Sequence, residues 1–331
     1  MVKPDETVLV TGGCGFLGRA LVGLILQHTR WSVRVLALPQ EAVPSGWTAR
    51  VEVVRGDITR MADVARAAQG CGILFHLAAL VGDAGTYAEH ERVTVGGTAH
   101  VFDVAMANKA RVVLTTSICA YGDAIQHGRC TEDTPLGRAQ GPYGRAKQGQ
   151  EALAWRFKSQ GGKVCVVRPA NIVGPGSGPW LLDAAQALRQ RLPALVGGGR
   201  GNAALTVVDN VADFLLLAAR TPAAYGQAFN VHDDLQVTWR GYFTDLATLL
   251  QAPHPRSVPR VLAYLGAHVA EPLFRRFWPR QRPPVTREAL NLIAWDSAFS
   301  TDKARALGWS PRVSYERMLM VLSQDIAARG L

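Results

Sequence analysis

Short apolar runs alternate with longer helical patterns along the first half of the chain, and this alternation limits the possible fold more than any other feature of the sequence. The runs predict six strands, and most of the intervals between them have the apolar spacing that is typical of helices. Strands that alternate with helices form a parallel sheet with helices on both faces. The apolar runs are Val8–Val10, Val33–Leu36, Val51–Val54, Ile73–Leu77, Val112–Leu114 and Val164–Val167, and the helical patterns are Phe16–His28, Met61–Ala68, Tyr87–Ala107 and Tyr143–Ser159.

The pattern changes after Arg168-Pro169, where loops rich in glycine and proline follow. Two further apolar pieces, Leu205–Val208 and Ala228–Val231, predict late strands that return to the sheet, and the chain from Val237 onward is mostly helical in pattern. We therefore expect an α/β fold in which a doubly wound parallel sheet carries a smaller, discontinuous C-terminal domain. The predicted main domain comprises residues 1–170 and 203–234, and the predicted second domain comprises residues 171–202 and 235–331.

The composition is that of a globular protein and excludes several other classes. Of the 331 residues, 48% are hydrophobic and 19% are charged, which excludes disordered, collagen-like and coiled-coil proteins. The five cysteines form no Cys-x-x-Cys pair, so we expect no metal site. The sequence has no run of about 18 apolar residues and no signal-peptide core near Met1, which predicts a cytoplasmic protein.

A glycine-rich turn follows the first predicted strand and opens the first predicted helix. The glycines are three residues apart, at Gly12, Gly15 and Gly18. This spacing lets the backbone turn tightly and approach a pyrophosphate at the helix N-terminus, where amide donors and the helix dipole favour anions. A glycine-rich segment alone can also be a plain tight turn, but the strand before it and the helix after it favour a dinucleotide site. The predicted sheet is therefore of the Rossmann type.

The second predicted strand ends where an acidic residue would accept a hydrogen bond from the adenosine ribose. The sequence there reads Ala37-Leu38-Pro39, without a carboxylate, so NAD and NADP both stay open, and the basic chain inclines the choice to NADP. Arg34 is either a phosphate ligand or a solvated strand residue, and we favour the second. Asp57, after the third strand, either accepts from the adenine amine or caps a helix.

Tyr143 and Lys147 are four residues apart, on one face of a predicted helix. An ammonium close to a phenol stabilises the phenolate and lowers the pKa of the tyrosine, as a general acid/base for alcohol–ketone interconversion requires. Such a pair alone is usually a solvated helix pair. Ser117, however, follows a predicted strand at the carboxyl edge of the sheet, where ligands of such folds bind. The sequence therefore predicts that Ser117 holds a substrate oxygen beside Tyr143.

These motifs together resemble the short-chain dehydrogenase/reductase superfamily in its extended branch, the NAD-dependent epimerase/dehydratase superfamily. The resemblance covers nearly the whole chain and implies an NAD(P)-binding main domain with a substrate-binding second domain. Thr94 stands where the family pattern often has asparagine, and the Tyr/Lys/Ser chemistry does not need that side chain. The further landmarks, in order, are His76–Ala79, Ser117–Gly122, Arg168–Pro175, Val208–Asp213 and Lys303–Trp309.

The resemblance also implies the roles of individual residues. The catalytic set would be Ser117, Tyr143 and Lys147, with Lys147 also binding the nicotinamide ribose. A homodimer would form through two helices of the main domain, at residues 87–107 and 143–159. The predicted cofactor contacts are Gly12, Gly15, Phe16, Leu17, Gly18, Asp57, Ile58, Ala78, Tyr143, Lys147 and Pro169.

Two branches of the superfamily compete for the substrate. Sugar-nucleotide epimerases and dehydratases clamp a second diphosphate, commonly with an arginine that residues 201–208 lack. The Asp209-Asn210 pair and the segment from Arg282 to Ala289 look instead like the 3β-hydroxysteroid dehydrogenase branch, which acts on sterols and related apolar hydroxy or keto substrates. We therefore predict an apolar small-molecule substrate. A catalytically silent, NADP-sensing protein is a further alternative, but such proteins usually lack the tyrosine or the lysine.

The net charge of +10 predicts an anionic partner. Nucleic acid is not expected, because the basic residues are scattered and no nucleic-acid-binding motif is present. Residues 251–290 contain seven arginines against two glutamates, a net +5, together with many apolar and aromatic residues. This pattern suits either a helix at an anionic membrane surface or a helix packed on the core with a solvated basic edge. Pro272 and Pro279 are expected to interrupt any long helix there.

Overall fold

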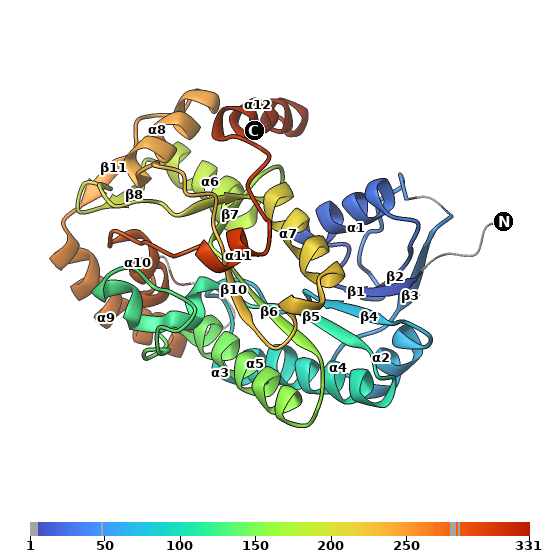
Figure 1. The fold of residues 1–331 in the computed structure, drawn as a ribbon. Coiled ribbons are helices and arrows are strands. Elements are labelled where there is room, and N and C mark those ends of the chain that lie inside the picture. Colours follow the sequence, from blue (N-terminus) through green and yellow to red (C-terminus); the bar gives the residue numbers. More distant parts are fainter. Residues whose placement is uncertain (1–5, 48, 279–282, 284) are drawn as a thin grey trace.

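A seven-stranded sheet forms the centre of the computed structural model, which describes residues 6–47, 49–278, 283 and 285–331 (Figure 1). Its strands are β1 (Thr7–Thr11), β2 (Ser32–Ala37), β3 (Val51–Arg55), β4 (Ile73–His76), β5 (Arg111–Thr115), β6 (Val164–Pro169) and β10 (Ala228–Val231). All pairings between these strands are parallel, in the order β10-β6-β5-β4-β1-β2-β3. The order changes direction between β1 and β4, as in a Rossmann fold.

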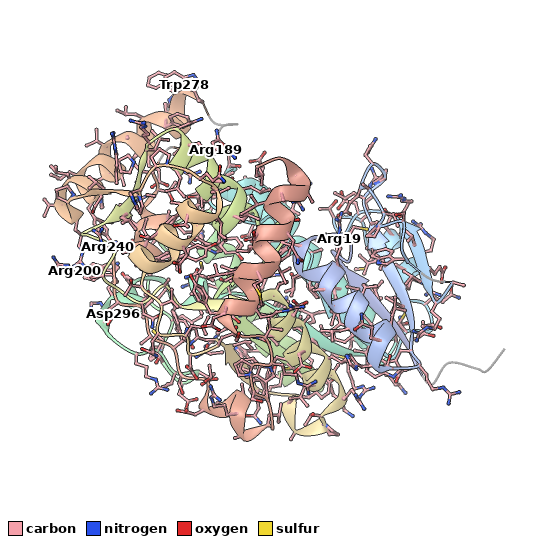
Figure 2. The ribbon with its side chains drawn as sticks, turned by 90° about the horizontal axis from the view of Figure 1, so that it is seen from above. Arg19, Arg189, Arg200, Arg240, Trp278 and Asp296 are labelled. Atoms are coloured by element: carbon pink, nitrogen blue, oxygen red, sulfur yellow. The ribbon has the colours of Figure 1, made fainter. Side chains whose placement is uncertain are left out.

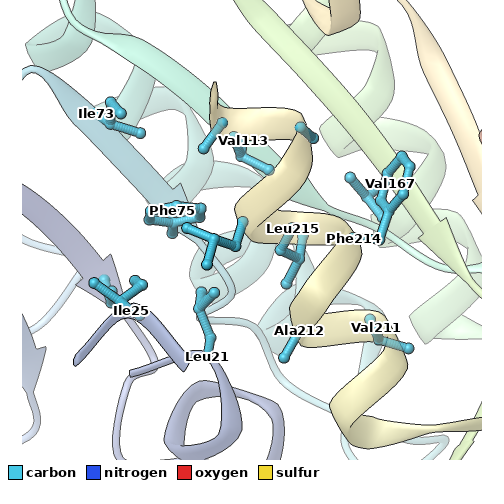
Figure 3. Close-up of a cluster of buried hydrophobic side chains, with 14 of the residues drawn as sticks. Leu21, Ile25, Ile73, Phe75, Val113, Val167, Val211, Ala212, Phe214 and Leu215 are labelled. Atoms are coloured by element: carbon cyan, nitrogen blue, oxygen red, sulfur yellow. The ribbon is translucent and has the colours of Figure 1, made fainter. Parts of the chain in front are cut away.

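Helices cover both faces of this sheet. One face carries α1 (Phe16–His28) and α7 (Val208–Arg220), and the other carries α2 (Met61–Ala68), α4 (Gly96–Ala107) and α5 (Pro142–Ser159). Figure 3 shows how Phe214 of α7 and Leu21 of α1 pack with Phe75 of the sheet in one buried cluster. Because the strands are covered on both faces, successive strand residues are apolar, which explains the continuous apolar runs of the sequence.

The predicted fold class is confirmed, with two local differences. The helical pattern over residues 87–107 is divided into α3 (Tyr87–His90), a π-helical turn (Glu91–Val95) and α4. The prediction that Leu205–Val208 returns to the large sheet is wrong, because β9 (Leu205–Val207) pairs with β7 (Asn171–Val173) in a separate sheet. The edge of the large sheet beyond β6 is occupied by β10, and Val208 already begins α7.

A second hydrophobic core lies at the end of the molecule away from β2 and β3 (Figure 1). Trp239, Tyr242 and Leu246 are buried at its centre. The division into two domains stays a prediction. The core is formed mainly by β8 (Pro193–Val196), α6 (Ala184–Arg189), α8 (Trp239–Leu249) and α12 (Tyr315–Arg329). The other elements are β11 (Arg256–Val258), α9 (Arg260–Phe277), α10 (Arg287–Ile293) and α11 (Asp302–Ala306), with 3₁₀ helices at Ile118–His127 and Pro222–Ala224 and a π-helical turn at Gly178–Asp183.

Candidate active site

The glycine turn between β1 and α1 is shaped by close backbone contacts. Gly12 has a φ of +71°, and a Cβ atom added to Gly18 would lie 2.1 Å from the Gly12 carbonyl oxygen. The Gly15 amide donates to that same oxygen over 3.0 Å. Gly15 is also the N-cap of α1, where no side chain caps the helix and no acidic residue lies in the first turn. The first amides of α1 therefore suit an anion, and the turn fits the pyrophosphate of a dinucleotide.

A carboxylate does lie at the end of β2, contrary to the prediction from Ala37-Leu38-Pro39. Glu41 Oε2 accepts a hydrogen bond from the Leu38 amide over 3.2 Å. Arg55 lies beside it and donates to the carbonyl oxygens of Leu38 (2.8 Å) and Glu41 (2.7 Å). The prediction missed Glu41 because the loop after β2 turns back and returns it to the strand end. The inclination to NADP, which assumed that this strand end has no carboxylate, therefore loses that support.

Two other candidates at this end have structural partners. Arg34 pairs with Glu52 at 2.8 Å and donates to the Ala67 carbonyl over 2.9 Å, so it ties β2 to β3 and α2 and is less solvated than we expected. Asp57 Oδ1 accepts from the Thr59 amide over 2.8 Å, in a local turn before α2.

The three predicted catalytic residues come together at the carboxyl edge of the sheet. Ser117 follows β5 and caps a 3₁₀ helix, with its Oγ accepting from the Cys119 amide over 3.1 Å. Tyr143 and Lys147 lie on α5, and the Lys147 ammonium is 5.4 Å from the centroid of the Tyr143 ring. Lys147 is buried and donates to the Thr115 carbonyl (3.1 Å) and to Gln150 Oε1 (2.8 Å). One face of α5 therefore points at the end of β5.

The surroundings of Tyr143 oppose ionisation of its phenol. Burial raises the pKa of Tyr143, nearby Cys119 and Glu288 raise it further, and a hydrogen bond with Ser117 acts in the opposite direction. Burial also lowers the pKa of Lys147 to about 8. The prediction that the pKa of Tyr143 lies below its ordinary value is therefore wrong, because desolvation disfavours the phenolate more than its neighbours stabilise it. Tyr143 is a neutral phenol, poised to donate a proton.

A chain of buried polar side chains connects Lys147 with the end of β1. Gln150 accepts from Lys147 and donates to Thr98 Oγ1 over 2.7 Å. Thr98 Oγ1 lies 2.8 Å from His76 Nε2, and His76 Nδ1 lies 2.7 Å from Thr11 Oγ1. Burial and the Lys147 charge lower the pKa of His76 to about 3, so the imidazole is neutral. Sequence reasoning missed Gln150, although its position three residues after Lys147 on one helix face was a signal.

Thr94, the departure from the family pattern, is fully buried in this region. Its Oγ1 accepts from the Leu80 amide over 3.1 Å, and its carbonyl accepts from Thr98 Oγ1 over 2.6 Å. The side chain therefore holds the loop after β4.

Glu288 is a buried carboxyl group at the start of the catalytic helix, and the sequence analysis did not single it out. It lies on α10, and its Oε1 accepts from the Gly144 amide. The α5 N-cap, Gly141, has no side chain to do this, so Glu288 caps the helix from a distant element. A Cβ atom on Gly141 would lie 2.3 Å from Glu288 Oε2, so glycine leaves room for the carboxyl group.

The second oxygen of Glu288 makes the group unusual. Oε2 is buried and has no hydrogen-bond partner among the described residues. Burial raises the pKa of Glu288 to about 8, the amides of Gly144 and Tyr143 lower it, and Asp83 and Glu271 raise it. At neutral pH the carboxyl group is therefore mostly protonated, and α5 is capped by a neutral acid.

A glycine turn at a Rossmann strand end, together with a serine, a tyrosine and a lysine at the same sheet edge, is the arrangement of an NAD-dependent dehydrogenase/reductase. The chain belongs to the NAD dependent epimerase/dehydratase family, whose model matches residues 8–231. The resemblance stated from the sequence is thereby confirmed.

Similar proteins include reductases and dehydrogenases. A 4-hydroxy-2-methyl-3-oxo-4-farnesyl-3,4-dihydroquinoline-1-oxide ketoreductase from Stigmatella aurantiaca is 32% identical over 324 residues, which are 95% of each chain. A 3beta-hydroxysteroid-dehydrogenase/decarboxylase (isoform 1) from Arabidopsis thaliana is 27% identical and is matched over 95% of this chain and 78% of its own length. The structure of UDP-glucuronic acid 4-epimerase from Bacillus cereus, solved with UDP-glucuronic acid and NAD, shares the fold with a TM-score of 0.77 at 18% identity, over 98% of this chain and 99% of that one.

Proposed function

We propose that this protein interconverts a secondary alcohol and a ketone on an apolar, sterol-like or 3-hydroxy/3-keto substrate, with Ser117, Tyr143 and Lys147 as the catalytic set. The observation that carries the proposal is the mixed character of the site. Tyr143 packs into a hydrophobic cluster to which the second part of the chain contributes Trp180 and Ile293. A proton-donating phenol beside apolar side chains suits a ketone on a hydrophobic skeleton.

In this mechanism Tyr143 supplies the proton that a ketone oxygen takes up on reduction. Its phenol is neutral, and Ser117 lies beside it to hold the same oxygen by a hydrogen bond. Lys147 is held by Thr115 and Gln150, and its ammonium stabilises the phenolate as the proton leaves. The bound nicotinamide supplies the hydride when the ketone is reduced and accepts it when the alcohol is oxidised. Reduction of a ketone uses the protonated phenol of Tyr143 as a general acid, and oxidation of an alcohol uses its phenolate as a general base.

The cofactor would lie along the glycine turn and the adjacent strand ends. The choice between NAD and NADP depends on Glu41 at the end of β2, because a carboxylate there accepts from a ribose hydroxyl and repels a 2′-phosphate. We therefore favour NAD over NADP. The residues that would hold the cofactor are Gly12, Gly15, Phe16, Leu17, Gly18, Asp57, Ile58, Ala78, Tyr143, Lys147 and Pro169.

The alternative function is that of a sugar-nucleotide epimerase or dehydratase. It needs cationic side chains for a second diphosphate, but residues 201–208 contain no arginine.

We further propose a cytoplasmic homodimer that makes peripheral contact with a membrane through residues 251–290. The dimer would form through the helical segments at residues 87–107 and 143–159, where Met106 is an exposed apolar residue.

The test is a cofactor-consumption screen with sterols, 3-keto acids and UDP-sugars. We expect NAD(P)H oxidation with an apolar ketone and none with UDP-sugars. Tyr143→Phe keeps the ring but removes the transferable proton, so turnover should fall by about 10²–10⁴-fold while cofactor affinity, measured by fluorescence titration, is retained. Lys147→Ala should reduce both turnover and cofactor affinity. Near wild-type turnover in Tyr143→Phe would show that the catalytic assignment is wrong.

A further inference from the structure

The outer side of α9 is a continuous apolar surface that no other described residue covers. Of the fifteen large hydrophobic residues exposed in the described part of the chain, seven lie between positions 261 and 278. Val261, Val269 and Phe277 are each exposed by more than 60%. We call this surface the α9 outer face, and it consists of Val261, Leu262, Leu265, Val269, Leu273 and Phe277, with Trp278 at its end.

The α9 outer face follows from the spacing of the helix. Its residues recur every three or four positions, which places them along one side of the helix. The opposite side carries Ala263 and Ala267, which pack into a buried cluster with Leu290 of α10. The helix continues through Pro272, contrary to the expected interruption, and is about 27 Å long. Figure 2 shows Trp278 at the outer edge of the molecule, beyond the end of the helix.

Within residues 251–290, the described charged side chains that are exposed all have one sign. Residues 251–290 contain no aspartate, and both of their glutamates are buried. Glu271, on α9, pairs with Arg275 (3.0 Å) and Arg287 (3.3 Å). Arg276 is exposed beside the apolar residues, and Arg256 precedes the helix. Two of the predicted basic residues, Arg280 and Arg282, lie outside the described residues.

We propose that the α9 outer face docks on the surface of an anionic lipid bilayer. A helix with an exposed apolar side and arginines at its margin lies in the plane of a membrane interface, where its apolar side chains enter the acyl boundary and its cations meet the lipid phosphates. No helix of the described residues is long and apolar enough to cross a membrane, so the contact is with one leaflet.

A second copy of the chain fits this face less well than lipid does. Two copies packed face to face would bring Arg276 and its neighbours of both chains together, without an exposed carboxylate in the segment to neutralise them. Like charges in a desolvated interface are unfavourable. An anionic bilayer would instead place lipid phosphates opposite these arginines, so that opposite charges meet.

The inner side of α9 connects the docking surface with the active site, and this step rests on the proposed function. Arg275 is not free for lipid, because it donates to the carbonyl oxygens of Asp83 (2.9 Å) and Gly85 (2.8 Å) in the loop after β4. Glu271 accepts from the Arg287 amide at the start of α10, over 2.9 Å. Since α10 carries Glu288, which caps the catalytic helix, the bilayer would lie against elements that frame the site for an apolar substrate.

The test is sedimentation of the full chain with vesicles of phosphatidylcholine alone or mixed with phosphatidylglycerol. The double variant Leu265→Glu/Val269→Glu places two carboxylates on the α9 outer face at positions that are 60% and 62% exposed, so the core is not disturbed. The control for a carboxylate introduced at an exposed apolar position elsewhere is Met320→Glu on α12, where the residue is 52% exposed; it changes the net charge by one unit, against two in the double variant. We expect binding to the anionic vesicles that weakens with salt, a loss of at least about tenfold in the double variant and no loss in the control.

Three results would overturn the proposal. One is no binding to anionic vesicles at low salt, and another is equal binding by the double variant and the wild type. The third is a concentration-dependent dimer that the double variant abolishes in the absence of lipid, which would assign the face to a second copy. Turnover of a soluble ketone is measured in parallel, so that failure of the proposed function is recognised separately from failure to bind lipid.

Discussion

Replacing Glu288 by glutamine isolates the energetic effect of one buried carboxyl group on the catalytic helix. Glutamine has nearly the same shape as a protonated glutamate and keeps an oxygen that accepts from the Gly144 amide. It cannot ionise. At a pH where Glu288 is protonated in the wild type, the two proteins should therefore have similar stability.

The difference between them should grow as the pH rises. Burial raises the pKa of Glu288 from its ordinary value of 4.5 to about 8, so the folded state holds the proton more tightly than the unfolded state. Below the unfolded value both states are protonated, and the full stabilisation is present. Between the two values, wild-type stability falls by about 1.4 kcal/mol per pH unit, and the fall ends near the folded pKa. The stability of Glu288→Gln relative to wild type should rise over this window by at most about 5 kcal/mol.

The assay is urea unfolding of both proteins at several pH values from 5 to about 9. The other titrating groups largely cancel in the difference between the two proteins. Glu91→Gln, at an exposed position on the π-helical turn before α4, is the control for loss of a surface carboxylate. A stability difference that stays constant with pH, or that falls as the pH rises, would refute the claim that Glu288 is buried as a neutral acid.

Two further substitutions test other parts of the site. Glu41→Ala removes the carboxylate at the end of β2 and leaves Arg55. The ratio of kcat/KM for NADPH to kcat/KM for NADH should therefore rise by about tenfold or more, as expected from one charged contact. An unchanged ratio would show that Glu41 does not face the cofactor. Gln150→Leu removes the side-chain acceptor of Lys147, so kcat/KM should fall by about 10–100-fold. The pH dependence of kcat/KM should also shift, because the pKa of Lys147 is about 8 in the wild type. Far-UV circular dichroism should stay unchanged, which shows that the fold is kept.

The sequence predicts those elements of the fold that depend on local patterns. The predicted helices Phe16–His28 and Met61–Ala68 have the same bounds in the structure. The spacing of apolar residues within each segment is enough to predict a helix with one buried side. The pairing of Leu205–Val207 was not predictable in this way. A three-residue apolar run specifies a strand but not its partner, and the partner is set by which sheet edge the rest of the chain leaves open.

The site residues also differ in whether a local sequence pattern reveals them. Gly12, Tyr143 and Lys147 are recognisable because short fixed spacings carry their chemistry. Glu41 and Glu288 were not recognised as site residues, because their relevance depends on contacts that no local spacing encodes. Glu41 is returned to its strand by a loop, and Glu288 meets the Gly144 amide across 144 positions of sequence.

Tyr143 shows this difference most clearly. The motif correctly predicts that Lys147 lies beside its ring, but burial in the fold raises the pKa of Tyr143 where the motif alone predicts that it is lowered. A Tyr-x-x-x-Lys spacing guarantees that an ammonium lies near the phenol, which taken alone favours the phenolate. The same packing buries Lys147 and partly buries Tyr143, and it lowers the pKa of Lys147 while it raises that of Tyr143. Ionisation of Glu288 would add a negative charge beside the phenol and raise its pKa further. The proton that the reaction needs is therefore kept on Tyr143 by burial, and ionisation of the carboxyl group that caps its helix would act in the same direction.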